Sequence, residues 1–174
     1  MTAPFGIPFS QALDPEIVIA ELSAQKFQVS PPNPHPGFAD YIVQCSPTMG
    51  VVWIKGIGNE IGNDVYGSGL ITAHSTMSGQ LIAKYGQPER TDLLSHDAIW
   101  VEPRDWVASL NQNERFYFDV WKRPASNQLP DDVASIFLGF QTYSMQDGAI
   151  ILEYASIKHE AAEAELAASF SDFL

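Results

Sequence analysis

A chain of 174 residues with 45% hydrophobic and 11% aromatic residues can bury one good core, and this composition excludes a largely disordered protein. The net charge of −12, from 21 acidic and nine basic residues, repels phosphate backbones and anionic lipid surfaces. We therefore expect no nucleic-acid and no membrane partner. The same charge would favour a basic partner, or it could simply keep the protein soluble.

The chain has a single cysteine, Cys45, which excludes an internal disulfide and a cysteine-rich zinc site. Because Cys45 ends the apolar run YIVQC, we expect a buried free thiol. The first residues, MTAPFGIPFSQALD, do not have the basic start and continuous apolar core of a signal peptide. No window approaches the ~20 apolar residues that span a bilayer. We expect one globular domain, residues 1–174, in the cytoplasm, and the sequence leaves its oligomeric state open.

The first expected elements are an extended arm and a short helix. Residues 4–13 are apolar with two prolines and a glycine, and should lie on the core as an arm. The sequence DPE at 14–16 predicts a helix start, with an N-cap acceptor followed by proline, and this helix should end near Lys26. Four prolines in residues 30–38 predict a stiff surface connector, with a proline-rich ligand for an aromatic groove as the alternative.

Two stretches rich in β-branched and aromatic residues, 39–45 and 50–57, predict a hairpin. Residues 58–69 are rich in glycine and asparagine and should form a long irregular loop. This loop has no GxxxxGK[ST] motif, so it is not a phosphate loop. Long ordered loops are often functional, which makes Asp64 and Tyr66 candidate binding residues.

From Leu70 the apolar residues return to helical spacing and predict a helix over residues 70–85. The side chains expected on its buried face are Leu70, His74, Met77, Leu81 and Tyr85. Gly86 and Pro88 should end this helix, because glycine suits the position after a helix and proline cannot continue one. His74 is expected to be a core histidine, with a ligand role as the alternative.

The remainder of the chain predicts strands separated by polar turns. The expected elements are a turn at 88–97, a strand at 98–101, a helix from Asp105 to 112, a strand at 115–121, a loop at 122–132, a hairpin of 133–143 with 149–155, and a C-terminal helix from 159. In strand 115–121, Tyr117, Asp119 and Trp121 should share one face. The C-terminal helix carries an apolar stripe of Ala162, Leu166, Phe170 and Phe173, which should pack on the sheet or meet a partner.

This order of elements predicts the α+β class. Helices are separated from runs of sequential strands, which favours antiparallel pairing. We expect a mainly antiparallel sheet of about five to seven strands, with three or four helices packed against it.

No motif in the chain names a reaction. There is no GxSxG elbow, no HExxH and no Rossmann fingerprint. The best metal-binding candidates are Asp92, His96, Asp97 and Glu102, but their spacing fits a solvated acidic loop better than a metal site. A carboxylate pair from Asp64, Asp92, Glu102 and Asp119 could serve a hydrolase, although 21 acidic residues will always offer some suggestive pair. We therefore expect no catalytic residue, no metal and no cofactor.

A binding surface fits the residues around the tryptophans better. Trp, Tyr and Arg dominate the energetics of protein interfaces when they are exposed together. The expected binding residues are Trp100, Glu102, Arg104, Asp105 and Trp106, joined by Asp64 and Tyr66. Arg104 could form a cation–π contact with Trp106 and an ion pair with Asp105. The alternative is that the tryptophans are core residues and the arginines neutralise neighbouring acids.

These observations predict a non-catalytic bacterial or phage protein that binds another protein, such as an acidic inhibitor, immunity or anti-defence protein. It would attract a basic partner by its charge and bury aromatic anchors. One alternative is a hydrolase with a carboxylate site. The other is a small-ligand-binding domain with a carboxylate-lined pocket between the sheet and the helix at 70–85.

Overall fold

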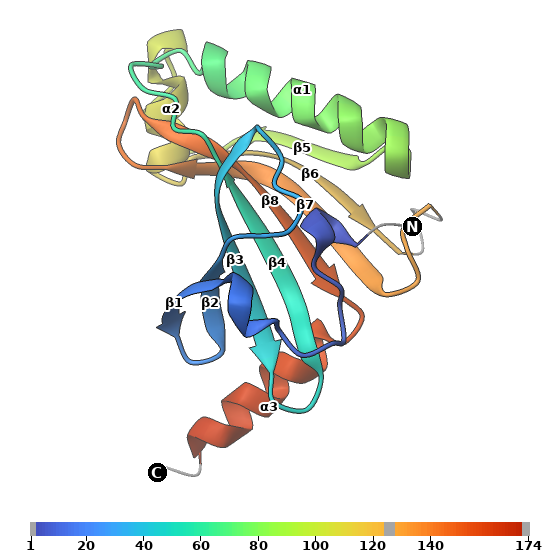
Figure 1. The fold of residues 1–174 in the computed structure, drawn as a ribbon. Coiled ribbons are helices and arrows are strands. Elements are labelled where there is room, and N and C mark those ends of the chain that lie inside the picture. The colour runs from blue at the N-terminus through green and yellow to red at the C-terminus, as the bar shows by residue number, and fades with distance from the viewer. Residues whose placement is uncertain (1–2, 124–127, 172–174) are drawn as a thin grey trace. The chain divides into compact units, whose positions relative to one another are not determined.

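The computed structural model describes residues 3–123 and 128–171 (Figure 1). Its α-helices are α1 (Ser68–Tyr85), α2 (Trp106–Asn111) and α3 (His159–Ser171), and its 3-10 turns are η1 (Pro4–Gly6), η2 (Pro15–Ile17) and η3 (Pro103–Asp105). Its strands are β1 (Val18–Ser23), β2 (Lys26–Val29), β3 (Phe38–Ser46), β4 (Gly50–Gly58), β5 (Glu89–Leu94), β6 (Arg115–Lys122), β7 (Val133–Thr142) and β8 (Gly148–Ser156). No helix in these two ranges is long and apolar enough to cross a bilayer.

The strands form one eight-stranded sheet in the order β1-β2-β3-β4-β8-β7-β6-β5. The expected sheet of about five to seven strands is therefore wrong. The pairs β1–β2, β2–β3 and β5–β6 are antiparallel. The strands that the sequence did not reveal are β1, β2 and β5, all at or near the two edges of the sheet.

The helix expected from residue 14 to Lys26 is wrong. The predicted cap does form, because Asp14 accepts the Glu16 N–H at 2.9 Å, but it starts only the single turn η2. The chain then becomes strand β1, which turns back into β2. Residues 17–19 are Ile, Val and Ile, whose branched side chains favour a strand once a partner strand is present.

The polar turn expected at 88–97 contains strand β5, and the strand expected at 98–101 does not form. β5 lies at the edge of the sheet, where charged side chains reach solvent, so its sequence ERTDLL does not show the usual apolar alternation. β5 forms because its six residues pair with β6, although its own sequence has only a weak preference for strand. Residues 99 and 100 instead donate their backbone N–H groups to the side chain of Glu114.

The described chain groups into two compact units. Unit 1 comprises Met1–Gly56, Pro130–Ile136 and Glu153–Leu174. In this unit the N-terminal arm lies along the start of β4, with Ser10 N–H donating to the Val51 carbonyl and Val51 N–H donating to the Gln11 carbonyl, both at 2.9 Å. Ile7 and Phe9 of the arm are buried, as expected. In α3, Ala162 is buried and Phe170 is exposed, while Phe173 lies outside the described residues.

Unit 2 comprises Ile57–Leu129 and Phe137–Leu152. Here α1 packs against the face of β6 that carries Tyr117, Asp119 and Trp121 (Figure 1). The helix predicted over residues 70–85 is confirmed as α1, and it ends before Gly86, whose φ is +80°. All the side chains predicted for its inner face are buried: Leu70, His74, Met77, Leu81 and Tyr85.

Candidate functional site

The structure brings together the two predicted binding segments, the glycine-rich loop and the start of α2. Val107 N–H donates to the Val65 carbonyl at 3.3 Å. Gly67 lies so close to Trp106 that a Cβ built on it would be 2.1 Å from the indole ring. Asp64 is engaged locally, since the N–H groups of residues 69 and 70 donate to its carboxylate at 3.0 and 2.9 Å and begin α1. Tyr66 is 59% exposed.

Trp106 is a half-buried packing residue of unit 2. Its ring meets Tyr117 and Phe140 edge to face, with centroid distances of 5.9 and 5.7 Å. The cation over this ring is Arg115, at 5.4 Å, where Arg104 was expected. Trp106 thus joins α2 to β6 and β7. This packing role is closer to the core residue considered as the alternative than to an exposed binding residue.

The remaining predicted residues lie on and around η3. Glu102 and Asp105 form a capping box, in which the Glu102 N–H donates to the Asp105 carboxylate at 3.2 Å. Arg104 is exposed on this turn, and Trp100 is half-buried. The capping box fixes the backbone that presents Arg104, so this segment has a defined conformation.

Two apolar residues that the sequence did not single out lie in the same segment. Ile99 is 75% exposed and Val101 is 53% exposed, and they flank Trp100. The N–H groups of Ile99 and Trp100 donate to one Glu114 oxygen at 3.1 and 2.9 Å. The sequence assigned these residues to a strand, where their side chains would have been half-buried. Tyr66, Ile99, Val101 and Arg104 are exposed side chains of the two predicted binding segments, and we call them together the exposed cluster.

A buried charge cluster lies beneath α1 in unit 2. Asp119 on β6 is fully buried, and it accepts hydrogen bonds from Arg90 Nε at 2.6 Å, Arg90 Nη2 at 2.7 Å and Ser78 Oγ at 2.6 Å. Arg90 and Asp119 are directly opposite in the β5–β6 register. Burial alone would raise the pKa of Asp119, but the hydrogen bonds from Arg90 and Ser78 lower it below its ordinary value.

His74 adjoins this charge cluster and is fully buried. Its Nε2 lies 3.8 Å from Asp119 Oδ2, and its ring packs against Tyr117 and Phe140 at centroid distances of 5.1 and 5.3 Å. Among the described residues, neither ring nitrogen makes a hydrogen bond of good geometry, and the backbone of Leu138 interacts with the ring only weakly. Burial lowers the pKa of His74, and the nearby Asp119 charge only partly opposes this effect. His74 is therefore a neutral core histidine at pH 7.

Ser78, His74 and Asp119 are the residue types of a hydrolytic triad, but their arrangement does not support that chemistry. All three are buried, and the Ser78 hydroxyl donates to Asp119 rather than to a base. The other acids considered for a carboxylate site have separate partners: Asp64 caps α1, Asp92 faces Arg115 at 4.0 Å and Glu102 caps η3. Within residues 3–123 and 128–171, no three His, Cys, Asp or Glu side chains group to hold a metal ion.

The buried His74 should make the protein less stable in weak acid. Its pKa is lowered in the folded state, so below about pH 6.5 the unfolded chain binds a proton that the folded chain does not. The stability present above this pH should fall as pH decreases, by up to ~1.4 kcal/mol per pH unit. Asp119 adds a second loss at lower pH, because its folded pKa is also lowered. Urea unfolding between pH 8 and pH 5 would measure the first effect.

His74→Leu should flatten this slope, whereas His96→Leu, at an exposed position, should leave it unchanged. If the stability of His74→Leu depended on pH as strongly as that of the unmodified protein, groups other than His74 would cause the pH dependence.

Comparison of the chain with protein-family models, with curated proteins and with solved structures finds no match.

Proposed function

We propose that this protein acts by binding another protein, with the exposed cluster of unit 2 as the docking surface. Its four residues come from two segments that are held together by the Gly67–Trp106 contact and the hydrogen bond between Val107 and Val65. The observation that carries the proposal is the exposure of Ile99 and Val101 in a segment fixed by Glu114. Large apolar side chains exposed together on a rigid backbone are typical of interaction sites.

The charge of this region favours a basic partner. Residues 89–115 contain six acidic and three basic side chains, and the whole chain carries −12. Arg90 and Arg115 already face acids within unit 2, so Arg104 is the basic side chain that the cluster offers to a partner. An acidic inhibitor, immunity or anti-defence protein in the cytoplasm would use its charge for association and its apolar residues for affinity.

Substitution of Ile99 by aspartate tests the proposal. The intact protein would serve as bait for host lysate at low and at moderate salt, and retained proteins would be identified by mass spectrometry. A retained basic protein should dissociate as salt rises, because salt screens exposed charges. Its affinity for the Ile99→Asp variant should be about tenfold weaker or worse, since a charge would replace a buried apolar contact.

The matched control is Ile157→Asp, which places the same charge at another exposed isoleucine in unit 1. It should retain the partner as the unmodified protein does. Equal loss in both variants would show a general charge effect, and full retention by Ile99→Asp would place the interface elsewhere; either result contradicts the proposal.

A further inference from the structure

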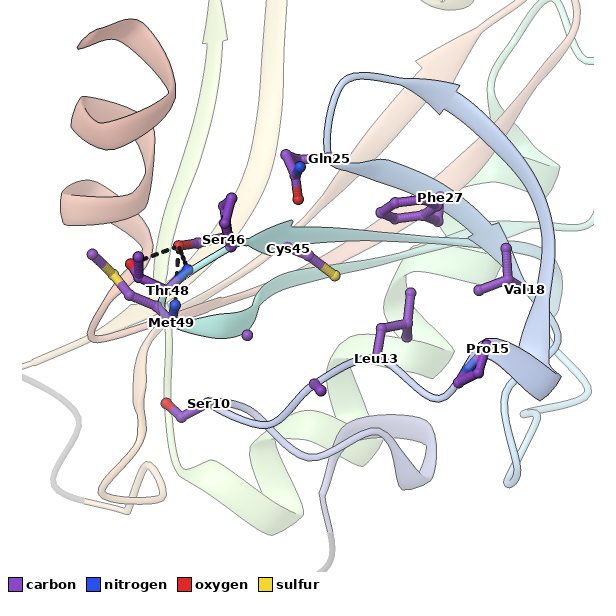
Figure 2. A pocket seen from close by; sticks show the side chains of 13 residues that line it. Ser10, Leu13, Pro15, Val18, Gln25, Phe27, Cys45, Ser46, Thr48 and Met49 are labelled. Carbon is purple, nitrogen blue, oxygen red and sulfur yellow. Dashed lines mark hydrogen bonds between the residues drawn. The ribbon is translucent and has the colours of Figure 1, made fainter. Parts of the chain in front are cut away.

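Unit 1 contains a cavity of about 540 Å³ between the N-terminal arm, the β1–β2 hairpin and the end of β3 (Figure 2). This volume lies within the ~300–1,000 Å³ typical of sites for small molecules. Val18 and Phe27 enter it from the hairpin, and Leu13 enters it from the arm on the opposite side (Figure 2). The side chain of Cys45 points between them.

The two ends of the cavity differ in chemistry. Leu13, Val18 and Phe27 make one end apolar, whereas Ser46 and Thr48 make the other end polar (Figure 2). An elongated ligand with an apolar body and a polar head would match this division. The apolar end would take the body out of water, which is the main source of affinity for such a molecule.

The polar end is backed by a carboxylate. Ser46 Oγ donates to Glu165, and Thr48 Oγ1 donates to the same carboxylate at 2.9 Å. The N–H groups of Thr48 and Met49 in turn donate to Ser46 Oγ at 3.2 and 3.1 Å. These bonds occupy the Ser46 hydroxyl as donor and acceptor, while each oxygen of Glu165 keeps room to accept another hydrogen bond.

Glu165 does not line this cavity but lines a second, smaller one of about 210 Å³, and the two cavities share Gln25, Cys45, Ser46 and Pro47. Among the described residues that line the two cavities, none is lysine or arginine. A negatively charged head would therefore meet a carboxylate with no cation to offset it, whereas a head that donates hydrogen bonds would find an acceptor.

We propose that these two cavities, joined at their shared lining, bind a small amphiphile: the larger one takes an alkyl or aryl body, and Glu165 in the smaller one accepts hydrogen bonds from a head that is not anionic, most tightly a protonated amine. The site lies in unit 1 and does not depend on the protein-binding role proposed for unit 2. Alcohols of the same chain length should bind more weakly than amines, and carboxylates should bind least.

Cys45 provides a built-in reporter of occupancy, because it is the only cysteine of the chain and lines both cavities. Burial raises the pKa of its thiol to about 11, so its reaction with a maleimide should be slow, and a ligand should slow it further. The probes are decylamine and decanoate below their critical micelle concentrations and decanol below its solubility limit. Decylamine should bind about tenfold more tightly than decanoate. Titration calorimetry gives an independent affinity for each probe.

Two pairs of variants distinguish binding at this site from a general attraction of the amine to the acidic protein. Glu165→Gln should remove the preference for the amine and keep decanol binding, while Glu160→Gln, the same change in the first turn of α3, should keep the preference. Val18→Trp should fill the cavity and abolish binding, while Leu22→Trp, at an exposed position of β1, should not. Circular dichroism would check that each variant is folded.

Equal binding of decanoate and decylamine, loss of the preference in both glutamine variants, or no binding of any probe would overturn the proposal. Because the glutamine pair leaves the lining of the larger cavity unchanged, the test stands even if Val18→Trp fails to fold.

Discussion

Replacement of Arg90 by alanine is expected to lower the free energy of unfolding by about 3 kcal/mol, measured by urea unfolding at pH 7. The Arg90 side chain is 44% exposed, but the carboxylate that it holds is fully buried. Without Arg90, Asp119 would keep only the Ser78 hydroxyl as a donor. A buried charge that loses its partner is costly, because a hydrogen bond from water does not replace the charge of the guanidinium.

Three further variants test this explanation. Asp92→Asn removes an exposed acid from the same strand and should change stability by less than about 0.5 kcal/mol. The double variant Arg90→Met with Asp119→Leu removes both charges and should be more stable than Arg90→Met alone. If the double variant were the less stable of the two, the loss in Arg90→Met would not come from an unpaired carboxylate.

Replacement of Gly67 by alanine is expected to lower the free energy of unfolding by about 2–4 kcal/mol. Gly67 precedes α1 with φ of +71°, a left-handed conformation that strains any residue with a Cβ. The added methyl group would also lie 2.1 Å from the Trp106 ring, so α2 or the glycine-rich loop would have to move. Thermal unfolding gives the stability change, and near-ultraviolet circular dichroism reports displacement of Trp106.

Gly79 provides the matched control on the same helix. It lies within α1 and nothing approaches the position of its Cβ within 4 Å. Gly79→Ala should therefore stabilise the protein by about 0.5–1 kcal/mol, because alanine loses less backbone entropy than glycine on forming a helix. Equal losses in the two variants would argue against a specific role for the Gly67–Trp106 contact.

The sequence predicted those elements whose signals are local. The helical spacing from Leu70 to Tyr85 and the following glycine defined α1 and its buried face. The alternation in residues 115–121 placed Tyr117, Asp119 and Trp121 on one side of β6. The predicted strands of the last hairpin form as β7 and β8, but Gly148 is the first residue of β8, so the Asp-Gly pair ends the connection and is not its turn. The loop expected at 122–132 includes residues 124–127, which lie outside the described residues.

Elements that depend on distant partners were not predicted. The cap at Asp14 is a genuine local signal for a helix, but pairing with β2 decided the structure of residues 18–23. Arg90 lay in an expected turn, so its position opposite Asp119 required the β5–β6 register. The cavity of unit 1 is assembled from three separate segments, and no spacing within one segment could indicate it.

The polar sequence of β5 has a consequence for the behaviour of the protein at high concentration. As an edge strand, β5 has backbone groups that another chain could pair with, and flat apolar edges promote aggregation. Glu89 and Asp92 oppose such contact, because pairing with another chain would take their charges out of water and bring the acidic side chains of two copies close together. At the other edge, β1 exposes Ile19 and Leu22, but its pairing with β2 is interrupted by two register shifts. Irregular backbone at one edge and charge at the other thus favour colloidal stability.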